Sequence, residues 1–362
     1  MQYRKLGKTN LQVSAIGLGC AQLGSSSTAY AVQIVHQAVE LGINFFDTAR
    51  GYRDSEVKIG LALEGQREGV YISSKTGAKT RDEAWQHIQE SLERLHTDYL
   101  DNCHLHGLRD TEDVEIRLGP GGALEALLEA RDQGLVRHIG CTSHTSRTLV
   151  EALQRFDFEV ILVPMNIVER EPLAELIPLC LARGVGVTIM KPVATGLLPA
   201  RLALKWLLNQ PIASAVPGAT TLEELEEDAL VGHLADLTLT PEEKSQVAEL
   251  RERLEQVRCR ICRECEPCPE EIPIGVTLGT DVMYDHYRTM GSEAFRSFSW
   301  SQAAMERDLK RREQLVAAIQ SCTRCELCEE RCPYGLPIME MLEDVVAPMQ
   351  DMLNIWRQLA GA

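Results

Sequence analysis

The chain has 362 residues, and this length predicts one large domain together with a small one. Its 44% hydrophobic and 25% charged residues exclude a disordered chain, and its net charge of −16 disfavours nucleic acid or an anionic membrane as the main partner. No apolar run approaches the roughly 18–20 residues that span a bilayer. The polar N-terminus lacks the apolar stretch of a signal peptide, so we expect a cytoplasmic protein that binds neither nucleic acid nor membrane.

Short apolar runs along the first 230 or so residues predict eight strands. They lie near residues 15–19, 43–46, 70–74, 99–105, 136–141, 160–163, 185–190 and 213–216. Amphipathic runs between them predict helices near 29–41, 55–63, 81–95, 122–133, 146–155, 172–183, 200–209 and 221–230. This alternation predicts an α/β fold, a (β/α)8 TIM barrel with a parallel sheet. A doubly wound open sheet is the alternative, but the count of eight and the missing Gly-x-Gly-x-x-Gly motif favour the barrel.

Polar side chains at the carboxyl ends of three predicted strands indicate the chemistry, because barrel active sites lie at that end. Asp47 and Tyr52 follow the second strand, Lys75 ends the third, and His104 and His106 end the fourth. Tyrosine is a weak acid with a pKa of about 10, which a nearby ammonium would lower. A carboxylate would hold that ammonium, and a histidine would orient a substrate oxygen. This set predicts reduction of a carbonyl group.

Residues 1 to about 255 resemble an aldo-keto reductase. The motifs that carry this resemblance are Arg4-Lys-Leu-Gly-Lys-Thr, Asp47-Thr-Ala with Tyr52, Ser55-Glu56, Lys75, Asp98-Tyr-Leu-Asp101 before His106, and Met190-Lys-Pro192. The resemblance implies hydride transfer from a reduced nicotinamide, NAD(P)H, to a small carbonyl substrate. It also implies that Tyr52 is the general acid, that Lys75 depresses the pKa of Tyr52, that Asp47 pairs with Lys75, and that His106 positions the carbonyl.

The sequence leaves the roles of two pairs of residues near this tetrad undecided. Strand alternation puts His104 and His106 on one face, so only the family spacing selects His106 and leaves His104 as a core or supporting residue. Arg50 and Arg53 flank Tyr52 and are either solvated or attract an acidic group of the substrate.

The resemblance also implies a set of cofactor contacts. Ser143, Asn166 and His144 are expected near the carboxamide, with His144 replacing the usual Asn and Leu162 standing where relatives often carry Gln. The segment after the eighth strand opens a helix and predicts a phosphate seat. Its expected contacts are Pro217, Gly218, Ala219, Thr220 and Thr221, together with Glu227 and Asp228 in the helix.

The charge of this helix bears on the choice of cofactor. No Lys or Arg occurs between Lys205 and Lys244, and Glu224 stands where NADPH-dependent relatives usually carry a cation for the 2′-phosphate. The sequence therefore favours NADH over NADPH, unless a cation reaches the site from another loop.

The twelve cysteines fall into two classes. Cys20, Cys103, Cys141 and Cys180 are scattered in apolar stretches and are predicted to be small buried residues. The other eight form two runs, Cys259-x2-Cys262-x2-Cys265-x2-Cys268-Pro and Cys322-x2-Cys325-x2-Cys328-x3-Cys332-Pro. In a reducing compartment such runs indicate metal binding rather than disulfides.

The second run has the spacing of a bacterial ferredoxin and predicts a 4Fe–4S cluster, whereas the first is one residue shorter before its last cysteine. Structural zinc, the alternative, usually takes two separated ligand pairs, so we predict two 4Fe–4S clusters. In two-cluster ferredoxins the fourth cysteine of each run binds the other cluster. That rule gives the sets Cys259, Cys262, Cys265 and Cys332, and Cys322, Cys325, Cys328 and Cys268.

We therefore predict a reductase barrel over residues 1–258 and a small, mainly helical, ferredoxin-like iron–sulfur domain over 259–362, with a helical insertion. Segments near 244–257, 282–288 and 303–318 have helical patterns. Three functions are compatible with this combination. In the first, the protein is a carbonyl reductase and its clusters are structural. In the second, the clusters exchange electrons with ferredoxin or another carrier. In the third, the protein is a nucleotide-binding electron-transfer or sensor protein with little reductase activity. The complete tetrad argues against the third.

Overall fold

The computed structural model describes residues 1–279 and 302–360, which form two compact units. The first unit comprises residues 1–194 and 198–244, and the second comprises 195–197 and 245–362. The helix predicted near 282–288 lies outside the described residues.

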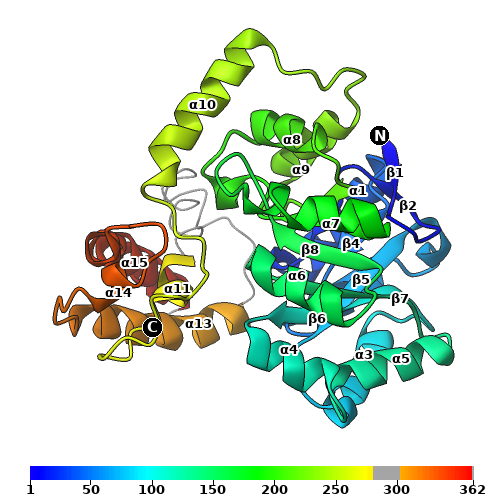
Figure 1. Cartoon of the computed structure of the whole chain (residues 1–362), viewed down its shortest axis with the longest axis horizontal. Helices are drawn as coiled ribbons and strands as arrows, with labels where there is room; N and C mark the ends of the chain where they lie inside the picture. Colours follow the sequence, from blue (N-terminus) through cyan, green and yellow to red (C-terminus); the bar gives the residue numbers. More distant parts are fainter. Residues whose placement is uncertain (280–301, 361–362) are drawn as a thin grey trace. The chain divides into compact units, whose positions relative to one another are not determined.

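The first unit contains a sheet of eight parallel strands whose neighbours follow the chain order (Figure 1). The strands are β3 (Leu18–Gly19), β4 (Phe45–Asp47), β5 (Tyr71–Thr76), β6 (Leu100–Leu108), β7 (Val136–Ser143), β8 (Val160–Pro164), β9 (Gly186–Met190) and β10 (Ser214–Ala215). The sheet curls until its two edges meet. Ile16 pairs with Ala215, and the N–H of Gly17 donates to the carbonyl of Ala215 at 2.8 Å. The predicted eight-stranded barrel is confirmed, and the open-sheet alternative is wrong.

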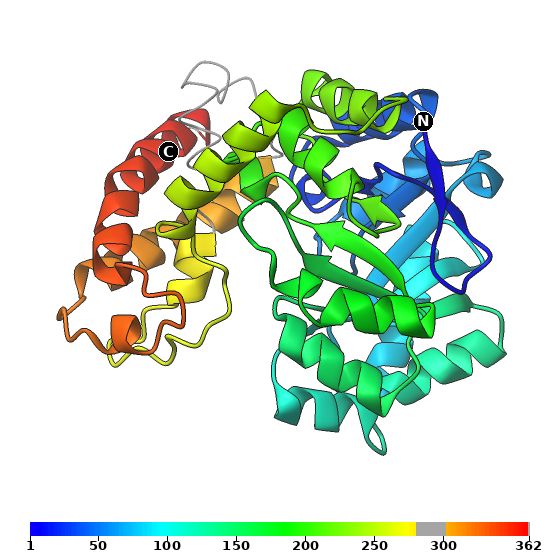
Figure 2. The ribbon, with the colours of Figure 1, turned by 45° about the horizontal axis from the view of Figure 1, so that its top comes forward.

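Helices surround this sheet in Figure 2, and all eight predicted helices are present. They are α1 (Thr28–Glu40), α2 (Ser55–Ala62), α3 (Arg81–Arg94), α5 (Ala123–Asp132), α6 (Ser146–Arg155), α7 (Leu176–Arg183), α8 (Ala200–Leu208) and α9 (Leu222–Gly232). Helix α7 begins later than predicted because Glu171–Leu173 forms a 3-10 turn. A further helix, α4 (Thr111–Leu118), begins at the N-cap Asp110 and was not predicted.

The amino end of the barrel is closed by an antiparallel hairpin, β1 (Tyr3–Lys5) and β2 (Gln12–Ser14), which the sequence analysis also missed. Leu6, Leu11 and Val13 pack with Phe45 and Val160 in one buried cluster. Such residues fill the lower layer of the barrel, so chemistry is confined to the opposite end.

A partly buried arginine joins two strands at this amino end. Arg67 donates from Nη1 to the carbonyl of Val70 at 2.9 Å and from Nη2 to the carbonyl of Tyr99 at 3.0 Å. Val70 and Tyr99 immediately precede β5 and β6, and Nη2 also bonds the Asp101 carboxylate at 2.7 Å. Arg67 therefore fixes where the two strands start.

The described part of the second unit consists of helices and loops. Its helices are α10 (Pro241–Glu255), whose first residues belong to the first unit, α11 (Ile274–Gly279), α13 (Gln302–Gln320), α14 (Leu327–Glu330) and α15 (Ile338–Ala360). Helices α10 and α13 match the patterns predicted near 244–257 and 303–318. Leu315 and Ile319 of α13 share a buried core with Leu342, Val345 and Met349 of α15.

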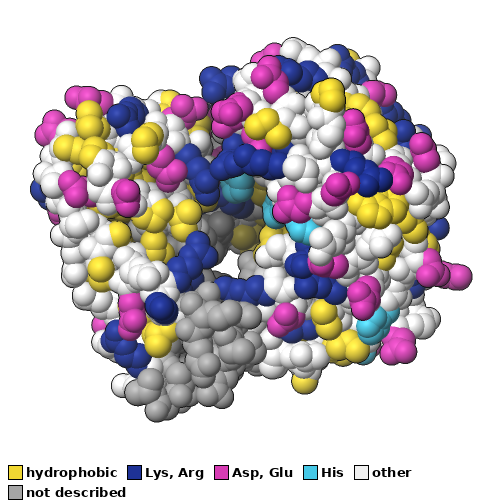
Figure 3. All heavy atoms as spheres, turned by 90° about the horizontal axis from the view of Figure 1, so that it is seen from below, with side chains coloured by type: hydrophobic (Ala, Val, Ile, Leu, Met, Phe, Trp, Pro, Cys, Tyr) yellow, Lys and Arg dark blue, Asp and Glu magenta, His cyan; other side chains and the backbone are white. Residues whose placement is uncertain are grey.

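The surface of the molecule in Figure 3 carries interspersed acidic, basic and hydrophobic side chains, a mixture typical of a solvent-exposed protein face. Among the described residues, no helix combines the length and the apolar character needed to cross a lipid bilayer.

Candidate functional site

The four predicted catalytic residues lie at the carboxyl ends of three neighbouring strands. Asp47 ends β4, Lys75 lies near the end of β5, His106 lies toward the end of β6, and Tyr52 stands in the loop between β4 and α2. Parallel strands in register bring their carboxyl ends to one edge of the barrel, so these side chains converge.

Lys75 is the hub of the site. Its buried ammonium donates hydrogen bonds to Asp47 Oδ2 at 2.7 Å, to the carbonyl of Thr48 at 2.6 Å and to Tyr52 Oη at 3.5 Å. Burial alone would lower the pKa of Lys75, but Asp47 and Tyr52 outweigh burial and raise it. Lys75 therefore stays a cation at neutral pH.

Tyr52 is held over this cation, with Lys75 Nζ 4.7 Å from the centre of the phenol ring. Burial raises the pKa of Tyr52 above its usual value of 10, and the opposing effect of Lys75 does not cancel that rise. The expectation of a depressed pKa is therefore wrong in its net direction, although Lys75 does act in the predicted sense. The phenol is fully protonated at neutral pH and can donate a proton.

His106 packs edge-on against Tyr52, with 5.6 Å between the ring centres. Burial, followed by the positive charges of Lys75 and Arg117, lowers the pKa of His106 to about 3, so its imidazole is neutral at pH 7. The ring of His104 is fully buried and packs against Gly140, where an added Cβ would lie 2.3 Å from Nδ1. Of the two histidines, His106 is the one in contact with Tyr52.

The two arginines beside Tyr52 are bonded to protein groups. Arg50 Nε donates to Glu90 Oε2 at 2.6 Å, and Arg53 donates to the hydroxyl of Ser25. These partners favour a structural role for both guanidinium groups over either alternative raised by the sequence.

The residues predicted to contact the carboxamide differ in whether their polar groups are already hydrogen-bonded within the protein. The Asn166 amide donates to Glu169 and to the carbonyl of Lys191, and its Oδ1 accepts from the N–H groups of Val168 and Glu169. Its amide group is thus hydrogen-bonded to its own turn and to the carbonyl of Lys191, and the predicted contact with the carboxamide stays a prediction.

Ser143 is likewise engaged, because its hydroxyl donates to the carbonyl of Leu108 at 2.7 Å. His144 is exposed, and its Nδ1 lies 3.1 Å from Lys191 Nζ. Leu162 is buried in the barrel core. Of these residues, His144 alone keeps a largely exposed side chain.

The predicted phosphate seat at the start of α9 is occupied by a side chain of the helix itself. Glu224 Oε2 accepts from the N–H of Thr220 at 2.7 Å, from its hydroxyl at 2.6 Å and from the N–H of Thr221 at 3.3 Å. Thr221 caps the helix and completes a capping box with Glu224. The donors expected to bind a phosphate therefore already hold a carboxylate. The spacing Thr221-x-x-Glu224 is the sequence signature of this box and would have revealed it.

Two further residues of this predicted seat, Pro217 and Ala219, are buried. The backbone of Gly218 lies against Gln22, whose Oε1 would be 2.3 Å from an added Cβ. Glu227 is exposed, whereas Asp228 is buried. Burial and the neighbouring Glu224 and Glu227 hold the pKa of Asp228 well above its usual value, so its carboxyl group keeps its proton to a higher pH than an exposed aspartate does.

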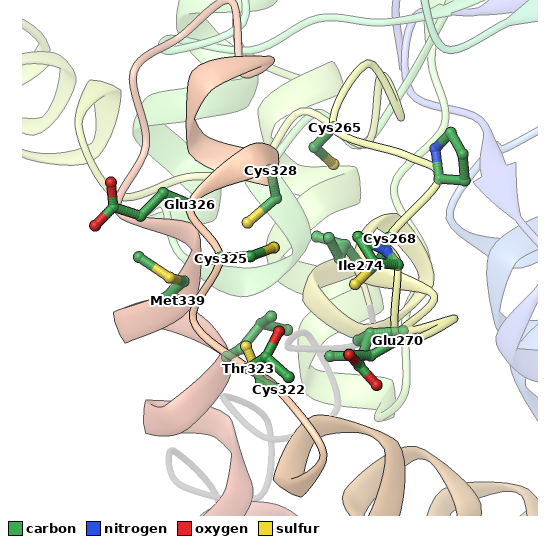
Figure 4. Close-up of a pocket in the computed structure, with 14 residues that line it drawn as sticks. Cys265, Cys268, Glu270, Ile274, Cys322, Thr323, Cys325, Glu326, Cys328 and Met339 are labelled. Atoms are coloured by element: carbon green, nitrogen blue, oxygen red, sulfur yellow. The ribbon is translucent and has the colours of Figure 1, made fainter.

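The four scattered cysteines are all buried in the barrel unit, as predicted. The eight clustered cysteines lie in the second unit, where Cys265, Cys268, Cys322, Cys325 and Cys328 line one pocket (Figure 4). Within the described ranges, no three His, Cys, Asp or Glu side chains are arranged around a single metal ion.

The two cysteine loops share an unusual backbone. Ile261 and Arg263 flank Cys262 with φ angles of 59° and 64°, and Arg324 and Glu326 flank Cys325 at 56° and 65°. Residues other than glycine rarely adopt this left-handed conformation. Where left-handed residues alternate with right-handed ones, successive backbone N–H groups point to the same side and form a nest that can bind an anion. In the first loop, the N–H of Ile261 donates to Cys259 Sγ at 3.3 Å.

Comparisons with known proteins place the barrel unit in one family. The family model described as the aldo/keto reductase family matches residues 15–201. An uncharacterized oxidoreductase of Bacillus subtilis is 29% identical, covering 66% of this chain and 93% of the relative. L-galactose dehydrogenase of Arabidopsis thaliana is 30% identical, covering 70% and 95%. An aldo-keto reductase from Bacillus halodurans, in its holo form, superposes with a TM-score of 0.61 at 28% identity, covering 69% and 96%.

Proposed function

Because the chain belongs to the aldo-keto reductase family, we propose that its barrel reduces the carbonyl group of a small molecule with a reduced nicotinamide cofactor. The observation that carries this proposal is the Lys75 hub, which joins a charged ammonium to Asp47 and to the protonated phenol of Tyr52. Tyr52 is then the acid catalyst, and the neutral His106 beside it is the group that orients the substrate.

When bound, the reduced nicotinamide supplies the hydride that the carbonyl carbon accepts. Tyr52 donates its phenolic proton to the carbonyl oxygen, so that hydride and proton together convert C=O to an alcohol. Lys75 stabilises the phenolate that remains, and Asp47 holds Lys75 in place. The neutral imidazole of His106 donates a hydrogen bond that aligns the oxygen with Tyr52.

For the cofactor, we favour NADH over NADPH. The carboxylate of Glu224 at the start of α9 would repel a 2′-phosphate, whereas an acidic side chain suits the free hydroxyls of an NADH ribose. NADPH remains the alternative, in which a cation from another loop offsets Glu224.

The substitution Tyr52→Phe tests the proposed acid catalyst. It removes the phenolic proton and keeps the ring, so we expect carbonyl reduction to fall by at least about 100-fold while the NADH dissociation constant changes little. The measurement is turnover of a panel of aldehydes, aldoses and ketones, with cofactor binding followed by nicotinamide fluorescence. Unchanged turnover of the best substrate would exclude the tetrad. A wild-type protein that reduces no carbonyl would favour the electron-transfer or sensor alternative.

We propose in addition that residues 259–362 form an iron–sulfur domain with two 4Fe–4S clusters. The donor set fits that cofactor, since eight thiols lie in two loops with matching nests, and nests of N–H groups occur at many Fe–S sites. The pocket groups Cys265 and Cys268 of the first run with Cys322, Cys325 and Cys328 of the second. The place of Cys268 beside these three cysteines supports the crosswise ligand set.

Exposure of Cys325 favours electron exchange with a carrier such as ferredoxin, because a cluster held there would lie near the surface. A hydride moves two electrons together, whereas a 4Fe–4S cluster passes one. Coupling the two sites therefore requires a substrate that tolerates a one-electron intermediate. The alternative is a carbonyl reductase whose clusters stabilise the second unit.

A further inference from the structure

The buried guanidinium of Arg117, in helix α4, contacts two of the strands that carry the site. Its Nη1 donates to the carbonyl of His106 at 2.9 Å, and its Nη2 donates to the carbonyl of Thr76 at 2.9 Å. Thr76 directly follows Lys75, so the two accepting carbonyls belong to His106 and to the neighbour of Lys75. Asp113, four residues earlier on α4, lies 3.5 Å from Nη1 and balances the charge.

His106 needs such an anchor because the β6–β7 ladder is irregular at this point. The pairing register shifts between Leu105 and Leu108, and Gly107 has a φ of 65°. The N–H of Gly107 donates to Thr142 Oγ1 at 2.7 Å instead of to a strand carbonyl. The backbone position of His106 is therefore determined by hydrogen bonds from side chains rather than by regular strand pairing.

Arg67 makes the same kind of contact at the other end of the same two strands. It bonds the carbonyls that precede β5 and β6, and its partner is Asp101. Arg67 and Arg117 thus perform matching structural tasks, but only the Arg117 end of this strand pair carries Lys75 and His106.

We propose that Arg117 is a positioning residue for the reductase: by holding the carbonyls of Thr76 and His106 in one planar fork, it fixes His106 relative to Lys75 and Tyr52. The proposal rests on the tetrad proposed above. A guanidinium suits this task because its two Nη groups donate in fixed directions, which a lysine ammonium does not reproduce. Arg117 touches neither the substrate nor the cofactor in this scheme.

The test compares Arg117→Met with the matched variant Arg67→Met. We expect both to lower the melting temperature, because each removes a guanidinium fork that joins two strands, fully buried at Arg117 and partly buried at Arg67. Arg117→Met should also lower kcat by about 10- to 100-fold, as small misplacements of catalytic groups do, while Arg67→Met keeps kcat within about threefold. The NADH dissociation constant should change less than about threefold in both. Arg117→Lys, which keeps the charge but not the fork, should recover only part of the lost kcat.

Equal kcat values for Arg117→Met and Arg67→Met at temperatures well below both melting points would overturn the proposal, as would full recovery in Arg117→Lys. If Arg117→Met does not fold, Arg117→Lys decides, because it keeps the charge and loses the fork. It must then lower kcat well below its melting temperature without weakening NADH binding. Tyr52→Phe is measured in parallel. Unchanged turnover in that variant would reject the tetrad itself, whereas a loss there with no selective effect at Arg117 would reject only this inference.

Discussion

At the scale of single residues, burial governs protonation in the barrel site more than neighbouring charges do. Lys75 stays charged because Asp47 pairs with it, but burial keeps Tyr52 protonated and His106 neutral. The spacing of the motifs predicts which residues meet. It does not predict the direction of the Tyr52 pKa shift, because burial depends on the packing of the whole barrel mouth.

These shifts predict the pH profile of carbonyl reduction. The reaction needs the protonated phenol, and the pKa of Tyr52 is raised above 10, so activity should persist through pH 9 and fall only above about pH 10. His106 has a pKa of about 3 and should add no acidic limb between pH 6 and 9. The measurement is kcat/KM for the carbonyl substrate at saturating NADH from pH 6 to 10.5. A limb near pH 6.5 that disappears in His106→Gln would contradict this assignment.

The role of Arg117 could not be predicted from the sequence. Its contacts with the carbonyls of Thr76 and His106 depend on helix α4 and on the bulge in β6, neither of which has a clear signal in the sequence. The tetrad, by contrast, follows from strand ends that apolar runs predict.

At the scale of secondary-structure elements, the eight strands were predictable because parallel strands buried on both faces are short, continuous apolar runs. Helix α4 was missed because its sequence, Thr-Glu-Asp-Val-Glu-Ile-Arg-Leu, has few apolar residues and resembles a polar loop. The capping box at the start of α9 was also missed, although its spacing is present in the sequence, and the phosphate seat expected there stays a prediction.

The role of Glu224, at the start of α9, in the choice between NADH and NADPH can be tested. Glu224→Gln keeps an acceptor for Thr220 and Thr221 but removes the charge, so kcat/KM with NADPH should rise by about tenfold relative to NADH, equivalent to about 1.4 kcal/mol. The control is Glu223→Gln, since Glu223 is exposed in the same turn, and it should leave the ratio unchanged. An unaltered ratio in Glu224→Gln would mean that the 2′-position of the cofactor lies elsewhere.

At the scale of the whole molecule, two compact units carry two kinds of chemistry in one chain. The barrel could be predicted from periodicity. For the second unit, the cysteine spacing predicted the ligands but little of the architecture, and helices α11 and α15 were not foreseen. A metal-binding loop is specified by its ligands rather than by a hydrophobic period, which leaves little pattern to read.

The proposed clusters predict the response of the second unit to loss of one ligand. Anaerobically purified protein should hold about eight irons per chain, and Cys325→Ser should lose up to about half of them. The variant should also become more sensitive to proteolysis after residue 258, because metal binding contributes to folding. Cys180→Ala, which changes a buried cysteine of the barrel, should keep the full iron content.

Electron paramagnetic resonance completes that experiment. A reduced-cluster signal that grows when NADH is added to the wild-type protein indicates electron exchange between the two chemistries. Clusters reduced only by a strong chemical reductant indicate a structural role. Wild-type iron content and protease resistance in Cys325→Ser would rule out Cys325 as a ligand.

The closure of the barrel also sets the order of events during synthesis. Ile16 and Gly17 find their partner only when Ala215 has been made, so the first strand of the sheet remains unpaired on one edge for most of translation. At about 5–20 residues per second, that wait lasts roughly 10–40 s. An exposed strand edge is a template for aggregation during this interval. The nascent chain is therefore expected to depend on chaperones until residue 215 emerges, and the barrel is ready to close before the last cysteine run leaves the ribosome.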